Sequence, residues 1–167
     1  MMAMSASFGT SEAGRRFLCD AMFARLGRWL RAAGYDTAIA VGHERDRALV
    51  LRARREGRLL LTRDRRILTI RGAPATTLLL SQDHVDACVA ELNRRLKLDW
   101  RHNPFSRCLV CNVELEPAGA ERSERLAAIP EGRGEVSACP SCERLYWEGD
   151  HVRRMRARLE RWVGEGG

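Results

Sequence analysis

Four short apolar segments, each followed by polar or helix-forming residues, constrain the fold of this chain more than any other feature. They lie at residues 17–19, 37–41, 58–62 and 75–80. The third reads RLLLT without alternation, which is typical of a strand covered on both faces. Strands that alternate with helices predict a parallel sheet flanked by helices, so the expected fold class is α/β.

The stretches between these segments show helical periodicity. Apolar residues recur at spacings of three and four at Leu26, Trp29, Leu30 and Ala33, with Arg25, Arg28 and Arg31 on the opposite face. We expect further helical segments at residues 44–56, 65–70 and 85–98. Inward residues should be Ala48, Leu49 and Ala53 in the first of these, and Val85, Cys88, Val89, Leu92 and Leu96 in the last.

An acidic residue stands just after each strand or in the first turn of the next helix. The four positions are Asp20, Asp46, Asp64 and Asp83. The carboxyl ends of parallel strands open on one edge of a sheet, so we expect these side chains to share that edge. Clustered carboxylates repel one another unless a cation neutralises them, and an all-oxygen site suits Mg²⁺ or Mn²⁺. The pattern therefore favours a metal-dependent phosphodiesterase.

Each acid also has a purely structural interpretation. Asp20 is then a solvated turn residue, and Asp46 interacts favourably with a helix dipole, by roughly 0.3–1 kcal/mol. Asp64 and Asp83 would each cap the helical segment that follows. Other phosphate chemistries lose support, because the chain has neither a G-x-x-x-x-G-K-[ST] loop nor a G-x-G-x-x-G fingerprint.

The chain changes character after residue 104, where two C-x-x-C pairs appear. Their members are Cys108, Cys111, Cys139 and Cys142. Four thiolates complete a tetrahedral site, so we expect a structural Zn²⁺, with two disulfides or an Fe–S cluster as alternatives. Alternating runs at 112–115 and 144–147 follow the pairs, as in a zinc ribbon, and residues 116–135 are expected to be an exposed excursion. Cys19 and Cys88 lie in apolar contexts and should be buried thiols.

Composition bears on the partners and the compartment. The net charge is +7, and the whole excess lies in residues 1–100 because acidic and basic residues balance in 101–167. A basic surface attracts polyanions, usually nucleic acid, although a solubility surface has the same charge. No apolar run approaches the ~20 residues of a membrane span, and residues 1–14 have no apolar signal-peptide core. We therefore expect a cytoplasmic protein with no membrane partner.

Four blocks of sequence, in order, carry a resemblance to a known family. They read FLCDAMFARLGRWLRAAGYDT, EGRLLLTRDRRIL, NPFSRCLVCNVEL and CPSCERLYWEGDHVRRM. The chain resembles the Mut7-C family from about Arg16 to Met155. That family pairs a PIN-like RNase domain with a C-terminal zinc ribbon. The resemblance implies a PIN-like domain at 16–100 and a zinc ribbon at 101–149. Composition and periodicity add a flexible leader at 1–15 and a helical tail at 150–167, which should pack back on the body, with contact to a partner as the alternative.

The resemblance also implies a metal-dependent ribonuclease and its site residues. Asp20 and Asp64 would be the main ligands of Mg²⁺ or Mn²⁺, Asp46 a further ligand or a water-orienting base, and Asp83 the fourth acid. Glu44 is a possible substitute for Asp46, and it lies in the segment His43-Glu44-Arg45, where relatives are often more acidic. Backbone phosphates of RNA would be held by Arg25, Arg28, Arg63 and Arg65. The ribbon would either contact RNA or brace the sheet.

Two other functions compete with this interpretation. One is a non-catalytic RNA-binding or ribosome-associated module with a vestigial acid cluster, which divalent-metal affinity would distinguish. The other is the nuclease half of a toxin–antitoxin pair, against which the cysteines argue. RNA and DNA both stay open as substrates, because nothing in the sequence visibly reads a 2′-hydroxyl. The sequence also does not distinguish endonucleolytic from exonucleolytic cleavage.

Overall fold

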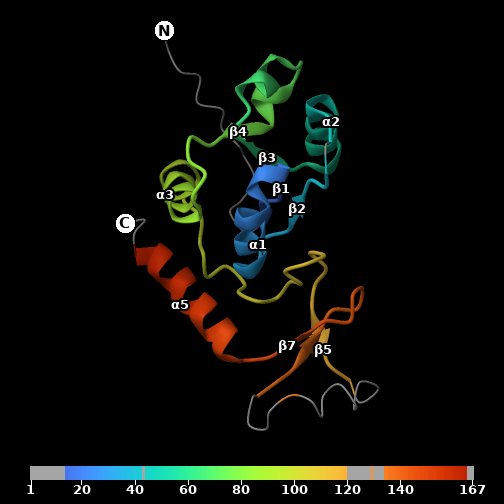
Figure 1. The fold of residues 1–167 in the computed structure, drawn as a ribbon, viewed down its shortest axis with the longest axis vertical. Helices are drawn as coiled ribbons and strands as arrows, with labels where there is room; N and C mark the ends of the chain where they lie inside the picture. Colours follow the sequence, from blue (N-terminus) through green and yellow to red (C-terminus); the bar gives the residue numbers. More distant parts are fainter. Residues whose placement is uncertain (1–13, 43, 120–128, 130–133, 165–167) are drawn as a thin grey trace.

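The computed structural model describes residues 14–42, 44–119, 129 and 134–164 (Figure 1). Its centre is a four-stranded sheet in the order β2-β1-β3-β4, in which every pair of neighbours is parallel. The strands are β1 Phe17–Cys19, β2 Thr37–Ile39, β3 Leu59–Thr62 and β4 Thr77–Leu79. The predicted parallel sheet flanked by helices is confirmed, whereas the finer PIN-like assignment stays a prediction.

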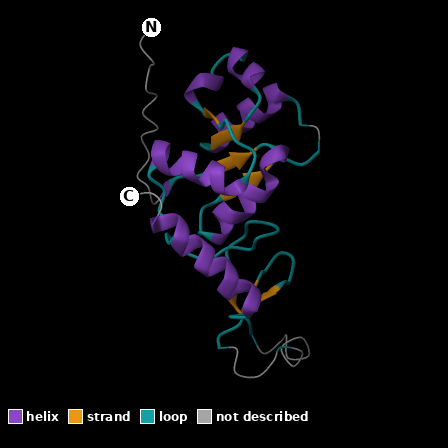
Figure 2. Ribbon diagram, turned by 60° about the vertical axis from the view of Figure 1, so that its left-hand side comes forward, coloured by secondary structure: helices purple, strands orange, loops and turns teal. Residues whose placement is uncertain are grey.

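Helices cover both faces of this sheet (Figures 1 and 2). Their bounds are η2 Ala21–Phe23, α1 Ala24–Ala32, α2 Asp46–Glu56, η3 Arg65–Thr69, η4 Ala73–Ala75, α3 Val85–Leu96 and α5 Asp150–Gly164. Alternate strand residues point to opposite faces, so Phe17 and Leu61 pack with α1, α3 and α5, whereas Leu18 and Leu60 pack with α2, η3 and η4. All four residues of β3 are buried, as its unbroken apolar run predicts.

Two details of the predicted helix faces are wrong. In α2 the buried residues are Leu49, Val50 and Ala53, while Ala48 is exposed, because the apolar stripe is rotated by one position. In α1 Arg31 is 5 % exposed and does not face solvent with Arg25 and Arg28.

Arg31 is buried because its guanidinium has backbone carbonyls to bind on both sides. Its Nε donates to the Thr37 carbonyl at 2.8 Å. Its Nη1 donates to the carbonyls of Leu109 and Val110, at 3.0 and 2.7 Å. The Thr37 N–H in turn donates to Asn112 Oδ1 at 2.9 Å. Both outward backbone groups of Thr37, at the start of edge strand β2, therefore have side-chain partners.

A second, antiparallel sheet follows in the order β5-β6-β7. Its strands are β5 Glu116–Pro117, β6 Ser137–Ala138 and β7 Leu145–Tyr146. The strand predicted at 112–115 forms slightly later, as β5. Within 112–115 the structure has only an isolated bridge, which pairs Glu114 with Arg107. The first end of the expected excursion at 116–135 thus belongs to the small sheet, and β6 begins two residues after the other end. Residues 120–128 and 130–133 of that segment lie outside the described residues.

The C-terminal helix α5 is part of the main core. Its residues Met155, Leu159 and Trp162 are buried in the same cluster as α1 and α3. The Trp162 ring lies edge-on to Trp29 and Trp100, with centroids 4.9 and 5.0 Å away. The last element of the chain therefore completes the core that the first element begins.

Asp36 joins three separate segments at the N-terminal edge of the parallel sheet. Its carboxylate accepts hydrogen bonds from Arg16 and Arg58, both at 2.8 Å, and from Asn112 Nδ2 at 2.6 Å. Burial alone would raise the pKa of Asp36. Hydrogen bonds from Arg58, Asn112 and Arg16 outweigh that effect and hold the pKa well below its usual range.

Replacing Asp36→Asn should lower the free energy of unfolding by about 2–3 kcal/mol at pH 7, because two arginines lose their charged partner. Because the pKa of Asp36 is lower in the folded protein than in the unfolded chain, its carboxylate stabilises the fold fully above the unfolded-state pKa of about 3.9. This stabilisation is lost as the pH falls towards the folded-state pKa. Urea unfolding should therefore show the difference between the two proteins shrinking below about pH 4.

The matched control is Arg55→Gln, which removes an ion pair whose arginine is 78 % exposed. Its effect should stay within about 0.5 kcal/mol. Equal effects of the two substitutions at pH 7 would contradict the role given to Asp36.

Candidate functional site

The four predicted cysteines form a compact cluster between the two C-terminal knuckles. Their sulfur atoms all lie within 4.8 Å of one another. The Sγ–Sγ distances are 3.6 Å for Cys108–Cys142, 3.2 Å for Cys111–Cys139 and 3.7 Å for Cys111–Cys142. These values are far from the ~2.05 Å of a disulfide and close to the ~3.8 Å expected for four sulfurs around zinc at ~2.3 Å. The donor set fits a structural Zn²⁺.

The two knuckles have the same local geometry. In each, the N–H of the second cysteine points at the sulfur of the first at 3.5 Å. The residue after each pair donates its N–H to the carbonyl of the first cysteine at 2.9 Å. These residues, Asn112 and Glu143, have left-handed backbones with φ of 72° and 57°. The repeated turn points the sulfur atoms of both pairs into one centre.

Polar groups around the cluster favour a thiolate at Cys108, whereas burial and the neighbouring cysteines raise the pKa of Cys111, and the neighbouring cysteines raise that of Cys142. The Tyr146 hydroxyl lies 3.2 Å from Cys108 Sγ and accepts the Leu109 N–H at 3.0 Å. Burial would raise the pKa of Cys108, but hydrogen bonds from Tyr146 and from the Cys111 and Val110 amides lower it to about 6. Burial lowers the pKa of Arg31, and the neighbouring Cys19, Cys108 and Cys111 oppose that effect, so a positively charged guanidinium next to the cluster is favoured by thiolates. Neither Tyr146 nor Arg31 could be predicted as a neighbour of the cysteines, because neither belongs to the C-x-x-C pattern.

Asp20 occupies the second predicted site, at the C-terminal end of β1. There β1 and β3 lie side by side, and the chain leaves them towards opposite faces of the sheet, which makes this a topological switch point. The buried Thr62 hydroxyl donates to Asp20 Oδ2 at 2.7 Å and accepts the Asp64 N–H at 3.1 Å. Thr62 therefore links the two principal predicted acids. The one sign of this role in the sequence is that Thr62 precedes Asp64 by two residues in the block EGRLLLTRDRRIL.

Asp64 is engaged by a neighbouring arginine. Its carboxylate accepts the Arg66 N–H at 2.8 Å, which confirms that it caps η3. It also accepts Arg66 Nε and Nη2, at 3.3 and 3.1 Å, and these bonds lower the pKa of Asp64. Asp46 is the first residue of α2 and is half-buried. Its possible substitute Glu44 is held by the Val41 N–H and by Arg52.

Of the four acids, Asp83 agrees least with the arrangement that the sequence predicts. Its side chain is 64 % exposed and pairs with Arg63 at 3.2 Å. The residue at the N-cap of α3 is His84, so the expected cap by Asp83 is wrong. Among the described residues, only the cysteines form a group of three or more potential ligands within 4.8 Å. The four acids thus share one sheet edge without converging on one point, and their assignment as a site stays a prediction.

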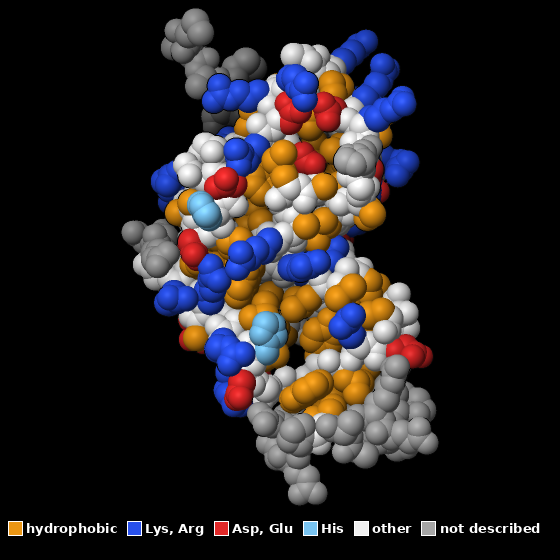
Figure 3. Space-filling view, viewed as in Figure 1, with side chains coloured by type: hydrophobic (Ala, Val, Ile, Leu, Met, Phe, Trp, Pro, Cys, Tyr) orange, Lys and Arg blue, Asp and Glu red, His pale blue; other side chains and the backbone are white. Residues whose placement is uncertain are grey.

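The predicted phosphate-binding arginines occupy two places. Arg63 and Arg65 line an open hollow of about 540 Å³ together with Leu68, Leu79, Leu80 and Ser81, beside the C-terminal ends of β3 and β4. Arg25 and Arg28 are exposed on α1. Figure 3 shows Lys and Arg side chains gathered at the end of the molecule that carries α2 and the segment between β3 and β4.

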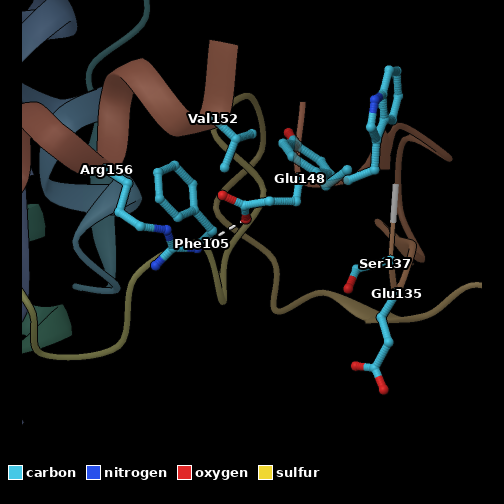
Figure 4. Close-up of a pocket in the computed structure, with 9 residues that line it drawn as sticks. Phe105, Glu135, Ser137, Glu148, Val152 and Arg156 are labelled. Atoms are coloured by element: carbon cyan, nitrogen blue, oxygen red, sulfur yellow. Dashed lines mark hydrogen bonds and ion pairs between the residues drawn. The ribbon is translucent and has the colours of Figure 1, made fainter. Parts of the chain in front are cut away.

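A smaller hollow of about 310 Å³ lies between the small antiparallel sheet and α5 (Figure 4). Arg156 covers the ring of Phe105 at 5.0 Å and pairs with Glu148 at 3.2 Å. These contacts join α5 to the segments that come before and after the small sheet.

The parallel sheet and the four cysteines both lie within the residues that match one known family. A family model described as the Mut7-C RNAse domain matches residues 15–159. The chain therefore belongs to the Mut7-C RNAse domain family, as the sequence resemblance predicts. Neither a curated protein nor a solved structure matches it. None of the described helices is long and apolar enough to cross a bilayer.

We expect one Zn²⁺ per chain, and removing it with a chelator should loosen the start of β2. Hydrogen exchange at the Thr37 amide, followed by NMR, should accelerate about tenfold because Asn112 leaves with its knuckle. The Leu60 amide, bonded to the Thr76 carbonyl inside the sheet, is the internal control and should not change. Unchanged exchange at Thr37 in metal-free protein would show that the knuckle holds its shape without metal.

Proposed function

We propose that this chain is a divalent-metal-dependent ribonuclease whose reaction centre lies at the C-terminal edge of the parallel sheet. The observation that carries the proposal is Asp20 at the switch point, held by the buried Thr62 hydroxyl that also binds the Asp64 amide. Membership of an RNAse domain family supports the same conclusion. A carboxylate fixed by a buried donor has few rotamers to lose when it binds a cation.

The donor chemistry at this edge suits a hard cation. Mg²⁺ usually needs only one or two carboxylates, with waters and substrate phosphate completing its shell, so Asp20 and Asp64 would hold it without a third acid in contact. A cation bound there would supply Lewis acidity for phosphodiester hydrolysis. Asp46, at the start of α2, would orient the attacking water and accept its proton. Thr62 would keep Asp20 in place, and Asp83 would form the outer part of the site.

RNA is the proposed substrate, and its backbone would run over the basic side chains at this edge. Arg63 and Arg65 border the hollow beside β3 and β4, where a phosphate can approach. Arg25 and Arg28 would contact phosphates further along the strand. The ribbon binds the opposite, N-terminal edge of the sheet through Asn112, so its proposed part is to brace the fold.

A specific observation favours the second candidate function, a non-catalytic RNA-binding module. Two of the four predicted acids, Asp64 and Asp83, are paired with arginines. In such a module the pairs would be permanent and the protein would bind RNA without cleaving it. Metal-dependent cleavage separates the two candidates.

The double variant Asp20→Asn/Asp64→Asn should lose cleavage of labelled single-stranded RNA in Mn²⁺ or Mg²⁺ by at least about 100-fold, because both principal ligands are neutralised. Asp150→Asn is the control, since that carboxylate is 68 % exposed at the start of α5. It should cleave like the unmodified protein. Equal RNA binding without cleavage by all three proteins would establish the binding module instead.

The variant Arg65→Gln should weaken RNA binding uniformly across sequences. Each phosphate contact to single strands contributes about 0.7 to the slope of log K against log salt, so the slope should fall by about that amount. Arg55→Gln, at the C-terminal end of α2, removes the same charge at the other sheet edge and should leave the slope unchanged. Fluorescence anisotropy over a salt series measures both; identical slopes for the two variants would contradict the proposed RNA path.

A further inference from the structure

Arg66 holds the Asp64 carboxylate in a fork. Two guanidinium nitrogens donate to the two carboxylate oxygens, at 3.3 and 3.1 Å, while the Arg66 N–H binds Oδ1 at 2.8 Å. The two side chains differ sharply in exposure, at 86 % for Arg66 and 23 % for Asp64. The acid is thus anchored by its own backbone turn, whereas the arginine reaches it from solvent.

Asp46 lies near enough to the same guanidinium to interact with its charge. Asp64, through its hydrogen bond and charge, is the main cause that raises the pKa of Arg66, and the charge of Asp46 adds to it. Both acids belong to elements on one face of the sheet, because α2 and η3 pack in the same core cluster. The positive charge of Arg66 therefore stands within the field of two acids that the proposed function assigns to a divalent cation.

We infer that Arg66 is an exchangeable internal cation of the acid site: it neutralises Asp64 until a divalent metal takes the carboxylate, and its guanidinium then becomes free to bind a phosphate of the RNA. This inference rests on the proposed function and deepens it. It explains how Asp64 can be paired with an arginine here and still act as a ligand.

The exposure of Arg66 is what makes the exchange feasible. An exposed ion pair shifts an equilibrium by no more than about fivefold, which a divalent cation can overcome. The Arg66 N–H would keep its bond to Asp64 and hold the turn during the exchange. The Arg58–Asp36 pair is the contrast, since Arg58 is 8 % exposed and its guanidinium is bound on several sides.

Exchange has a thermodynamic consequence. If metal releases Arg66 and RNA captures it, each ligand strengthens the binding of the other by the same factor. Metal would then bind weakly to the free protein and more tightly once a nucleic acid is present.

The test compares Arg66→Gln with Arg65→Gln in the full-length, zinc-loaded protein, by calorimetric titration with Mn²⁺ and no nucleic acid. Arg65 is the matched control because it removes the same charge from the same short helix, and among the described residues it has no ion-pair partner. Arg66→Gln should bind Mn²⁺ about three- to fivefold more tightly than Arg65→Gln. Equal affinities would overturn the inference.

Two further readouts separate this inference from the proposed function. Titration with Mg²⁺ should shift the Nε–Hε NMR signal of Arg66, and an uncleavable 2′-O-methyl oligonucleotide should raise Mn²⁺ affinity in the unmodified protein more than in Arg66→Gln. Tighter Mn²⁺ binding by Arg66→Gln without RNA cleavage would support the exchange and remove the nuclease. RNA cleavage together with an Mn²⁺ affinity that Arg66→Gln leaves unchanged would support the nuclease function and overturn the exchange. Absence of Mn²⁺ binding by every variant would overturn both.

Discussion

The contacts of Asp36 are the constraint on which the rest of the structure depends. One carboxylate binds Arg16 before β1, Arg58 before β3 and Asn112 in the first knuckle. Three segments that are distant in sequence are therefore fixed by charge at a single point. With β1 and β3 aligned there, their C-terminal ends are aligned too, and Asp20 meets the Thr62 hydroxyl. The N-terminal edge thus sets the geometry of the edge where we place the chemistry.

The two edges of the sheet have different electrostatic characters. At the N-terminal edge, acids and arginines are partly buried and satisfied from several sides, so their arrangement is rigid. At the C-terminal edge, the ion pairs of Asp64 and Asp83 involve more exposed side chains that can rearrange. A parallel sheet allows this division, because every strand starts at one edge and ends at the other.

Much of this architecture could be predicted from periodicity and spacing. The unbroken apolar run of β3 indicates a strand covered on both faces, and the two C-x-x-C pairs indicate the cysteine cluster that the structure assembles. Long-range pairing could not be predicted, because it depends on which side chains meet in space. Periodicity placed Arg31 on a polar helix face, yet the carbonyls of a knuckle far along the chain make its burial favourable. The sequence likewise groups four acids along one edge but does not show that Arg66, two residues after Asp64, turns its side chain back onto that carboxylate, because side-chain direction depends on the local turn.

Strand β2 lies at an open edge of the sheet, and the metal module shields its beginning. Asn112 and Arg31 occupy the N–H and C=O of Thr37, which a strand of another molecule would otherwise use. We expect the shield to depend on the metal that the cysteine cluster can hold, because the first knuckle supplies both Asn112 and the carbonyls that hold Arg31. Loss of the metal would therefore promote self-association as well as lower the stability of the fold, because strands from further copies of the chain could pair with the uncovered edge of the sheet.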